Sequence, residues 1–352
     1  MSLLDEAEPV RDGETLDACR LGEYLAAQVS GLVLPLVVRQ FPSGFSNLTY
    51  LLTAGSREFV LRRPPQGTLP KSGHDMGREF RVLSALQGAF AESPRPLHLC
   101  ADESVIGAPF YVVERIRGII LRRDYPAGLE PTPALVRVQQ CALIDTLARL
   151  HGLDHHALGL DEFGRPEGYV ARQVEGWSGR YQRVLTADAA SADAVTKWLA
   201  TNRPPDTKPA ALIHNDYKLD NVVFDAAVPA RLIGVLDWEM ATVGDPWMDL
   251  GCSLAYWIEA GDPAELQETR MLPTHLPGSL TRSEVVQRYA LARAVDAPEF
   301  RFYRVFGLFR LAVIVQQIYY RFFHGQTRDP RFAALGPMAR VLIARAETET
   351  RA

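Results

Sequence analysis

The residue types best suited to chemistry gather in one region of the chain. The stretch IHNDYKLDN places Asp216 five positions before Asn221, and Asp237 follows sixteen positions later in VLDWE. Phosphoryl transfer from ATP needs an aspartate that orients the attacking hydroxyl and accepts its proton. It also needs oxygen ligands for Mg²⁺, which an asparagine and a second aspartate can supply. The order and spacing of these three residues provide all three groups.

A plainer interpretation of the same residues stays open at this stage. In this interpretation Asp216, Asp220 and Asp237 are merely turn and cap residues, as most aspartates at strand ends are. His214, two positions before Asp216, is expected to be a structural hydrogen-bonding group rather than an acid or base. Asp249 is expected to tie the loop together without contacting the reacting atoms.

Short strands and longer helices must position this region. Residues 210–213 and 231–236 are predicted strands, and each is followed by acidic residues. The second strand ends at Asp237, so a hairpin turn can return that side chain beside Asn221. Asp245 followed by Pro246 is a helix-start signal. Apolar residues at helical spacing predict helices over 133–150, 245–258 and 300–323.

The first third of the chain predicts a sheet with one helix. Residues 48–53 and 58–63 form a hairpin pattern that Pro64-Pro65 stops, and residues 109–116 predict a buried strand. A helix over 75–90 has one apolar face, on which Glu79 is the only carboxylate. The polar segment after Ile116 marks a boundary between a sheet domain, residues 1–116, and a mainly helical domain, residues 117–352.

Composition excludes several classes of protein. The 352 residues are 47% hydrophobic and 23% charged with a net charge of −4, which is typical of a globular protein. No basic run indicates nucleic-acid binding, and no apolar stretch approaches the roughly 20 residues of a membrane span. The acidic start lacks the features of a secretory signal and the four cysteines are widely spaced, so we expect a cytoplasmic protein with reduced thiols.

Three motifs in order resemble the aminoglycoside phosphotransferase family of kinase-like enzymes that phosphorylate small molecules. They are H-x-D-x-x-x-x-N at His214–Asn221, D-W-E at Asp237–Glu239 and G-D-P-x-x-D-L at Gly244–Leu250. The sequence of this region is similar to that of kinase-like domains in acyl-CoA dehydrogenase family members and their bacterial stand-alone relatives. The resemblance, from about Phe41 to Gly325, implies a bilobal α+β protein-kinase-like fold. It also implies Asp216 as the catalytic base, Asn221 and Asp237 as metal ligands, and ATP and Mg²⁺ as cofactors.

The resemblance places the nucleotide between the two lobes. A cation on the third strand then neutralises phosphates and is held by a carboxylate on the small-lobe helix. Arg62 is expected in that role, on the same strand face as Val60, with Glu79 as its partner. Arg63 replaces Arg62 if the register slips by one residue. A solvated arginine and a surface glutamate are the alternative.

Two further segments are expected to contact the nucleotide. The loop 41–47 lacks a G-x-G-x-x-G pattern, so Ser46 and Asn47 would supply hydrogen-bond donors to the phosphates, unless the loop is a plain turn. Residues Glu114 to Ile116 would form the hinge, where backbone groups contact the adenine.

The acceptor is the least defined part of the prediction. Arg310 and Arg321 on the last long helix favour an anionic, partly apolar acceptor over a polycationic aminoglycoside. The resemblance implies a hydroxylated acyl-CoA or a related metabolite. An antibiotic-modifying enzyme, a nucleotide-binding pseudokinase module and, more weakly, a protein kinase are the alternatives, and no protein partner is predicted.

Overall fold

The computed structural model describes residues 3–42, 47–65, 75–327 and 329–351. The chain divides into two compact units, neither of which is continuous in sequence. The first unit contains residues 1–120, 126–128 and 221–241, and the second contains residues 121–125, 129–220 and 242–352. The predicted single boundary after residue 116 remains a prediction. Residues 221–241, which carry two of the predicted site residues, belong to the first unit.

An antiparallel five-stranded sheet forms the centre of the first unit. Its strand order is β1-β2-β3-β5-β4, and the hairpin predicted from residues 48–63 is the β2–β3 pair. Proline stops β3, since proline cannot donate to a strand ladder. The strands are β1 (Leu36–Gln40), β2 (Leu48–Ala54), β3 (Arg57–Arg63), β4 (Pro96–Cys100) and β5 (Phe110–Glu114).

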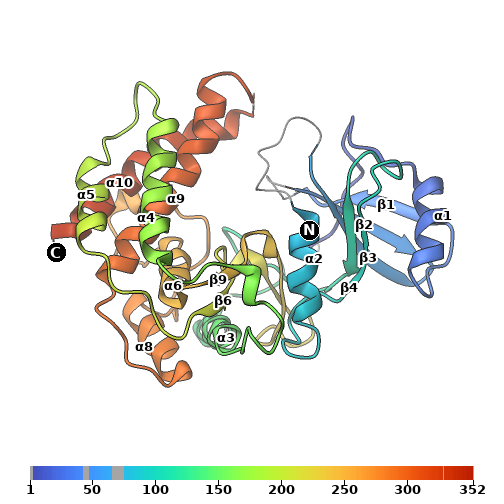
Figure 1. Cartoon of the computed structure of the whole chain (residues 1–352), viewed down its shortest axis with the longest axis horizontal. Coiled ribbons are helices and arrows are strands. Elements are labelled where there is room, and N and C mark those ends of the chain that lie inside the picture. The colour runs from blue at the N-terminus through green and yellow to red at the C-terminus, as the bar shows by residue number, and fades with distance from the viewer. Residues whose placement is uncertain (1–2, 43–46, 66–74, 328, 352) are drawn as a thin grey trace. The chain divides into compact units, whose positions relative to one another are not determined.

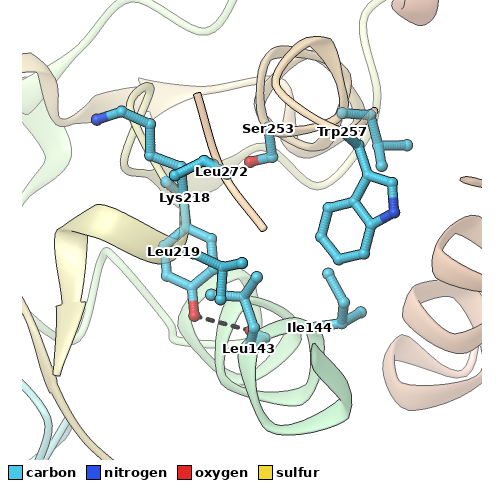
Figure 2. A pocket seen from close by; sticks show the side chains of 9 residues that line it. Leu143, Ile144, Lys218, Leu219, Ser253, Trp257 and Leu272 are labelled. Carbon is cyan, nitrogen blue, oxygen red and sulfur yellow. Dashed lines mark hydrogen bonds between the residues drawn. The ribbon is translucent and has the colours of Figure 1, made fainter. Parts of the chain in front are cut away.

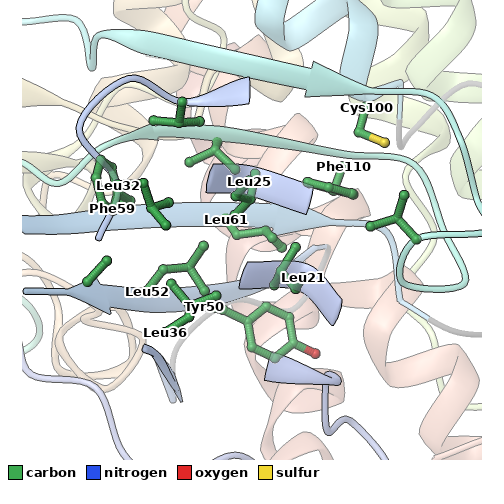
Figure 3. Close-up of a cluster of buried hydrophobic side chains, with 14 of the residues drawn as sticks. Leu21, Leu25, Leu32, Leu36, Tyr50, Leu52, Phe59, Leu61, Cys100 and Phe110 are labelled. Carbon is green, nitrogen blue, oxygen red and sulfur yellow. The ribbon is translucent and has the colours of Figure 1, made fainter. Parts of the chain in front are cut away.

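The two faces of this sheet are covered by different helices. Figure 1 shows α1 (Ala18–Gln28) on one side of the sheet and α2 (Met76–Ala85) on the other. The α1 side holds a buried apolar cluster that includes Leu21, Leu25, Phe59 and Leu61 (Figure 3). Because strand side chains alternate between faces, Val60 and Arg62 of β3 lie on the α2 side.

A second, two-stranded sheet completes the first unit. β7 (Val222–Phe224) pairs antiparallel with β8 (Leu232–Val235), and a 3₁₀ turn, η3 (Trp238–Met240), follows. The backbone N–H of Leu236 donates to the carbonyl of Asn221 at 2.8 Å. The hairpin that returns the segment before Asp237 to Asn221 is therefore present.

The second unit is mainly helical, with one small sheet formed by β6 (Ala211–Ile213) and β9 (Thr242–Gly244). Thr207, before β6, donates its backbone N–H to Asp245, the residue that caps α6. The α-helices are α3 (Pro133–His151), α4 (Tyr169–Arg183), α5 (Asp193–Thr201), α6 (Pro246–Ala255), α7 (Ala264–Glu268), α8 (Arg282–Arg293), α9 (Arg301–Phe323) and α10 (Leu335–Arg351). The 3₁₀ turns of the chain besides η3 are η1 (Asp161–Phe163), η2 (Leu219–Asn221) and η4 (Pro330–Ala334).

Helices α6 and α9 cross at glycines. A Cβ on Gly307 would lie 2.1 Å from the carbonyl oxygen of Gly251, and a Cβ on Gly251 would lie 2.5 Å from the carbonyl oxygen of Tyr303. Only residues without a side chain allow this approach. The crossing fixes Asp249 on α6 and Arg310 on α9, both of which contact the loop that follows β6.

The predicted elements are present, and several of their ends differ. The helix predicted over 75–90 ends at Ala85, and the one predicted over 245–258 ends at Ala255. Helices α1, α4, α5, α7, α8 and α10 and strands β1, β4, β7 and β9 were not predicted. Among the described residues, no helix combines the length and apolar character needed to cross a bilayer. The four cysteines, all in the described part of the chain, are free thiols.

Candidate active site

Arg62 lies at the centre of a charged cluster in the first unit. Its Nη1 is 2.7 Å from Glu79 Oε1, so the predicted pair of Arg62 and Glu79 is in contact. Its Nη2 is 2.9 Å from Asp237 Oδ1 and 3.4 Å from Glu239 Oε2. Arg63 lies on the opposite face of the sheet, where its Nη1 donates to the carbonyl of Ile106. The register therefore turns Arg62, and not Arg63, toward Asp237.

Burial strengthens the electrostatic interactions between the side chains of this cluster. The side chain of Arg62 is 12% exposed and that of Glu79 only 2%. Burial opposes the charge on Arg62, but Glu79, Asp237 and Glu239 outweigh it and raise the pKa of its guanidinium well above the ordinary value. Burial raises the pKa of Glu79, although the charge of Arg62 opposes that rise. One cation faces three carboxylates, so the cluster carries an excess of negative charge that suits added cations.

Asp237 and Glu239 form the open side of the cluster. Their side chains are 34% and 17% exposed, against 2% for Glu79. Asn47 Nδ2 donates to Glu239 Oε2 at 2.6 Å. Asp237 has φ +66°, one of only three non-glycine positive φ angles in the described residues, together with Asn215 and Ala294. Strained backbone of this kind tends to occur at functional sites. Asn215 precedes the predicted catalytic base Asp216, and Asp237 is itself a predicted metal ligand.

Asn221 and Asp237 provide the donor types that Mg²⁺ prefers, an amide oxygen and a partly exposed carboxylate. The Leu236–Asn221 backbone hydrogen bond brings their chain segments together, and Asn221 is 8% exposed. No group of three or more His, Cys, Asp or Glu in the described residues could hold a metal by itself. Asn221 and Asp237 would therefore suit a magnesium ion that takes its remaining ligands from phosphate or water.

The other residues predicted to contact the nucleotide differ in their surroundings. Ser46 lies outside the described residues, whereas Asn47 is buried beside Glu239. Val60 shares the face of Arg62 and pairs with Val113 in the β3–β5 ladder. The Glu114 carboxylate forms ion pairs with Arg95 and Arg57, and its backbone N–H donates to the carbonyl of Arg95. Ile116 packs against Gly234 of β8.

Asp216 lies in the second unit, on the loop between β6 and η2. Its Oδ2 is 2.8 Å from Lys218 Nζ, and the Asp216 side chain is 20% exposed. Lys218 also lies 3.2 Å from Asp220 Oδ1 and 5.6 Å from the centre of the Tyr256 ring. Burial opposes its charge, yet Asp216 and Asp220 raise the pKa of Lys218 above the ordinary value. Asp216 is thus a reachable carboxylate held by a buried cation.

Asp249 anchors the loop that carries Asp216. Its Oδ2 accepts the backbone N–H of His214 and its Oδ1 accepts that of Asn215, both at 2.8 Å. Asp249 is completely buried, and His151 Nε2 lies 3.1 Å from Oδ2. Burial alone would raise the pKa of Asp249, but the hydrogen bond and charge of His151 lower it overall. Asp249 thus ties the loop together as expected, and the His214 ring accepts the backbone N–H of Asp216 at Nδ1, 3.3 Å away, as expected of a structural hydrogen-bonding group.

Two further side chains hold Asn215, the residue before Asp216. Arg310 Nη2 donates to the Asn215 carbonyl at 2.7 Å, and the Tyr169 hydroxyl donates to Asn215 Oδ1 at 3.2 Å. Arg310 is buried, and the charge of Asp216 is among the influences that raise the pKa of its guanidinium against the effect of burial. Arg321, which was also expected near the acceptor, lies three turns further along α9 and is exposed. Only Arg310 of that pair contacts the loop.

A small apolar cavity lies behind the same loop (Figure 2). The Tyr217 hydroxyl donates to the carbonyl of Leu143 at 2.7 Å, which ties the loop to α3. Figure 2 shows the Lys218 side chain extending away from Trp257. The cavity is lined by Leu143, Ile144, Tyr217, Lys218, Leu219, Ser253, Leu254, Trp257 and Leu272.

The sequence did not point to three residues that join these networks. The sequence indicates Glu239 only as part of the D-W-E motif, although the D-x-E spacing could have suggested a second carboxylate at the site. Lys218 follows Asp216 by two positions, and that spacing alone does not predict an ion pair. His151 ends α3, and only tertiary packing brings it to Tyr289 of α8 and Asp249 of α6.

Comparison with known proteins identifies the class. The crystal structure of a candidate aminoglycoside phosphotransferase from Ralstonia eutropha JMP134 is similar, with a TM-score of 0.79 and 28% identity. The alignment covers 96% of this chain and 99% of that one. The fold is therefore the α+β fold of the protein-kinase-like phosphotransferases, as predicted, with the larger sheet in one unit and most helices in the other.

Sequence comparison gives the family. The model of the phosphotransferase enzyme family (APH) matches residues 37–272, and this chain belongs to that family, which confirms the resemblance. Acyl-CoA dehydrogenase family member 11 of Rattus norvegicus is 37% identical over 299 residues, which are 82% of this chain and 37% of that protein. Family member 10 of Mus musculus is 36% identical over 321 residues, 90% of this chain and 30% of that protein. The chain thus spans well under half the length of these relatives.

Proposed function

We propose that this member of the small-molecule phosphotransferases transfers the γ-phosphoryl group of ATP, with Mg²⁺, to a hydroxyl group of a small molecule. The observation that carries the proposal is the cluster in the first unit, where Arg62 is held by Glu79, Asp237 and Glu239. A buried guanidinium with fixed partners suits phosphate oxygens. The partly exposed carboxylates beside it suit a hard divalent cation.

Each residue has a role in the proposal. Asp216 orients the acceptor hydroxyl and takes its proton, while Lys218 holds the Asp216 carboxylate in place. Asn221 and Asp237 would hold Mg²⁺, which neutralises charge on the phosphates when bound. Arg62 binds phosphate oxygens, and Glu79 keeps its guanidinium oriented. Val60, Asn47, Ser46 and residues 114–116 are proposed to contact the rest of the nucleotide.

The proposed acceptor is a hydroxyacyl-CoA or a related hydroxylated metabolite. Two of the similar relatives are named as acyl-CoA dehydrogenase family members, so an acyl-CoA is a reasonable ligand class for the shared region. Lys218 forms an ion pair with Asp216, and Arg310 interacts with it electrostatically. Cations beside the proposed catalytic base favour an anionic acceptor over a polycationic one. A location in the cytoplasm remains part of the proposal.

A panel of acceptors tests this function. ADP release would be measured with Mg-ATP and, in parallel, a 4-hydroxyacyl-CoA, choline, kanamycin and spectinomycin. Turnover with the hydroxyacyl-CoA well above the rate without acceptor supports the proposal. Turnover with an aminoglycoside alone would instead support the activity named for the Ralstonia eutropha protein. ATP binding without transfer to any acceptor would favour a nucleotide-binding pseudokinase module.

A further inference from the structure

Two guanidinium groups flank one buried indole next to the loop of Asp216. Trp177 on α4 is 4% exposed. The guanidinium carbon of Arg180 lies 4.4 Å from the centre of its ring, and that of Arg310 lies 5.0 Å away. The Arg310 guanidinium also contacts the loop itself, because its Nη2 donates to the Asn215 carbonyl. A line of contacts therefore runs from the residue before Asp216 to Arg180.

This line is positively charged. Arg183 follows Arg180 by one helical turn, and both are exposed. Burial lowers the pKa of Arg180, and the charges of Arg310 and Arg183 lower it further. Within the described ranges no carboxylate forms an ion pair with Arg180 or Arg183, and the nearby Glu175 is paired with Arg203. Arg180 and Arg183 repel each other and Arg310, whose own charge is offset by Asp216.

Helix capping accounts for only part of this arrangement. Basic residues in the last turn of α4 interact favourably with the helix dipole, and this interaction is weak for exposed side chains. That effect does not account for the stacking of Arg180 on the same indole as Arg310, which comes from a different helix. Gathering like charges around a partly desolvated site is unfavourable unless an anion is bound there.

We propose that Arg180, Arg183, Arg310 and Trp177 form an anion-recognition surface that selects acceptors carrying a phosphate or carboxylate group besides the hydroxyl that receives the phosphoryl group. The inference rests on the proposed function, because it assigns the acceptor side of the same reaction. Arg310 links the surface to the Asp216 loop, and the exposed Arg180 and Arg183 make the direct contacts. Guanidinium groups bind such anions with two parallel hydrogen bonds.

The test compares three acceptors that share one hydroxyacyl group. A 4-hydroxyacyl-CoA carries phosphates, the free 4-hydroxy acid carries a carboxylate, and its N-acetylcysteamine thioester is uncharged. KM and kcat would be measured for the wild type, R183Q and R180Q/R183Q. The control R301Q/R331Q removes the same charge at exposed arginines paired with Glu299 and Asp329. Thermal melting confirms that each variant is folded.

R180Q/R183Q should raise KM at least tenfold for an anionic acceptor, with a smaller rise in R183Q and little change in kcat. A rise confined to the CoA thioester identifies phosphate as the bound group, and a rise confined to the free acid identifies carboxylate. No change, an equal rise for the uncharged thioester, or the same rise in R301Q/R331Q overturns the inference.

Direct binding separates this inference from the proposed function. Coenzyme A and the free hydroxy acid would be titrated calorimetrically into the wild type and R180Q/R183Q, which requires no turnover. At least tenfold weaker binding of either ligand by the variant supports the surface even if no acceptor is phosphorylated. Absence of binding to the wild type, or equal affinities, overturns the surface even if neutral hydroxyls are phosphorylated.

Discussion

Replacing Asp249 with asparagine should weaken the whole loop that carries Asp216. The carboxylate accepts the backbone N–H groups of His214 and Asn215 at 2.8 Å and a contact from His151 at 3.1 Å. An asparagine has one acceptor oxygen, so its amide NH₂ must face at least one of these two N–H groups. That buried donor then lacks a partner, which costs about 1–3 kcal/mol, and the remaining bonds lose their charge assistance.

Together these effects predict a loss of roughly 3 kcal/mol in the free energy of unfolding for D249N. Urea unfolding followed by far-UV circular dichroism measures it, and the midpoint should fall by roughly 1 M. D225N is the matched control, because Asp225 is a turn residue whose side chain pairs with the exposed Arg231. A midpoint for D249N within experimental error of that for D225N would refute the anchoring role of Asp249.

Two further variants test the charged networks. E79Q should weaken ATP binding about tenfold, since Arg62 loses its most buried partner and shifts toward Asp237, whereas E175Q, which alters an exposed pair with Arg203, should leave the calorimetric Kd unchanged. E284Q tests the capping box of α8, where the Arg137 hydrogen bond and the Thr281 backbone lower the pKa of Glu284 to about 2. A lowered folded-state pKa stabilises the protein above the unfolded value near 4.3, and this contribution is lost as the pH falls toward 2. The difference in urea midpoint between wild type and E284Q should therefore be largest at pH 7 and shrink at pH 4 and pH 3, and a difference that stays constant with pH would contradict the assignment.

The sequence predicted the elements with strong local signals. The β2–β3 hairpin, the helix around Glu79 and helices α3, α6 and α9 follow from alternation, helical spacing and caps. Strand β4 begins with proline and has a weak pattern, so its identity depends on pairing with β5. Helix α4 contains two glycines and few apolar residues, and its packing against α9 supplies what its local propensity lacks.

The candidate site likewise contains residues that the sequence predicts and residues whose contacts depend on tertiary packing. Asp216, Asn221 and Asp237 were found because their residue types and order suit one reaction, and the pairing of Arg62 with Glu79 followed from strand alternation and one buried carboxylate. The contacts of His151 with Asp249 and Tyr289, and of Arg310 with Asn215 and Trp177, join helices and loops far apart in sequence, so no local pattern predicts them. The positive φ of Asp237 is likewise set by tertiary packing, since aspartate tolerates this conformation better than most residues but does not impose it.

Transfer of radiolabelled phosphate from [γ-³²P]ATP by D216N tests the central claim most directly. The matched control is D220N, which removes a second carboxylate paired with the same Lys218. With the best acceptor of the panel, D216N should lose at least about a thousandfold in kcat while its calorimetric Kd for Mg-ATP stays within threefold of the wild type, and D220N should keep kcat within tenfold. Transfer by D216N at a rate close to that of D220N would contradict the account.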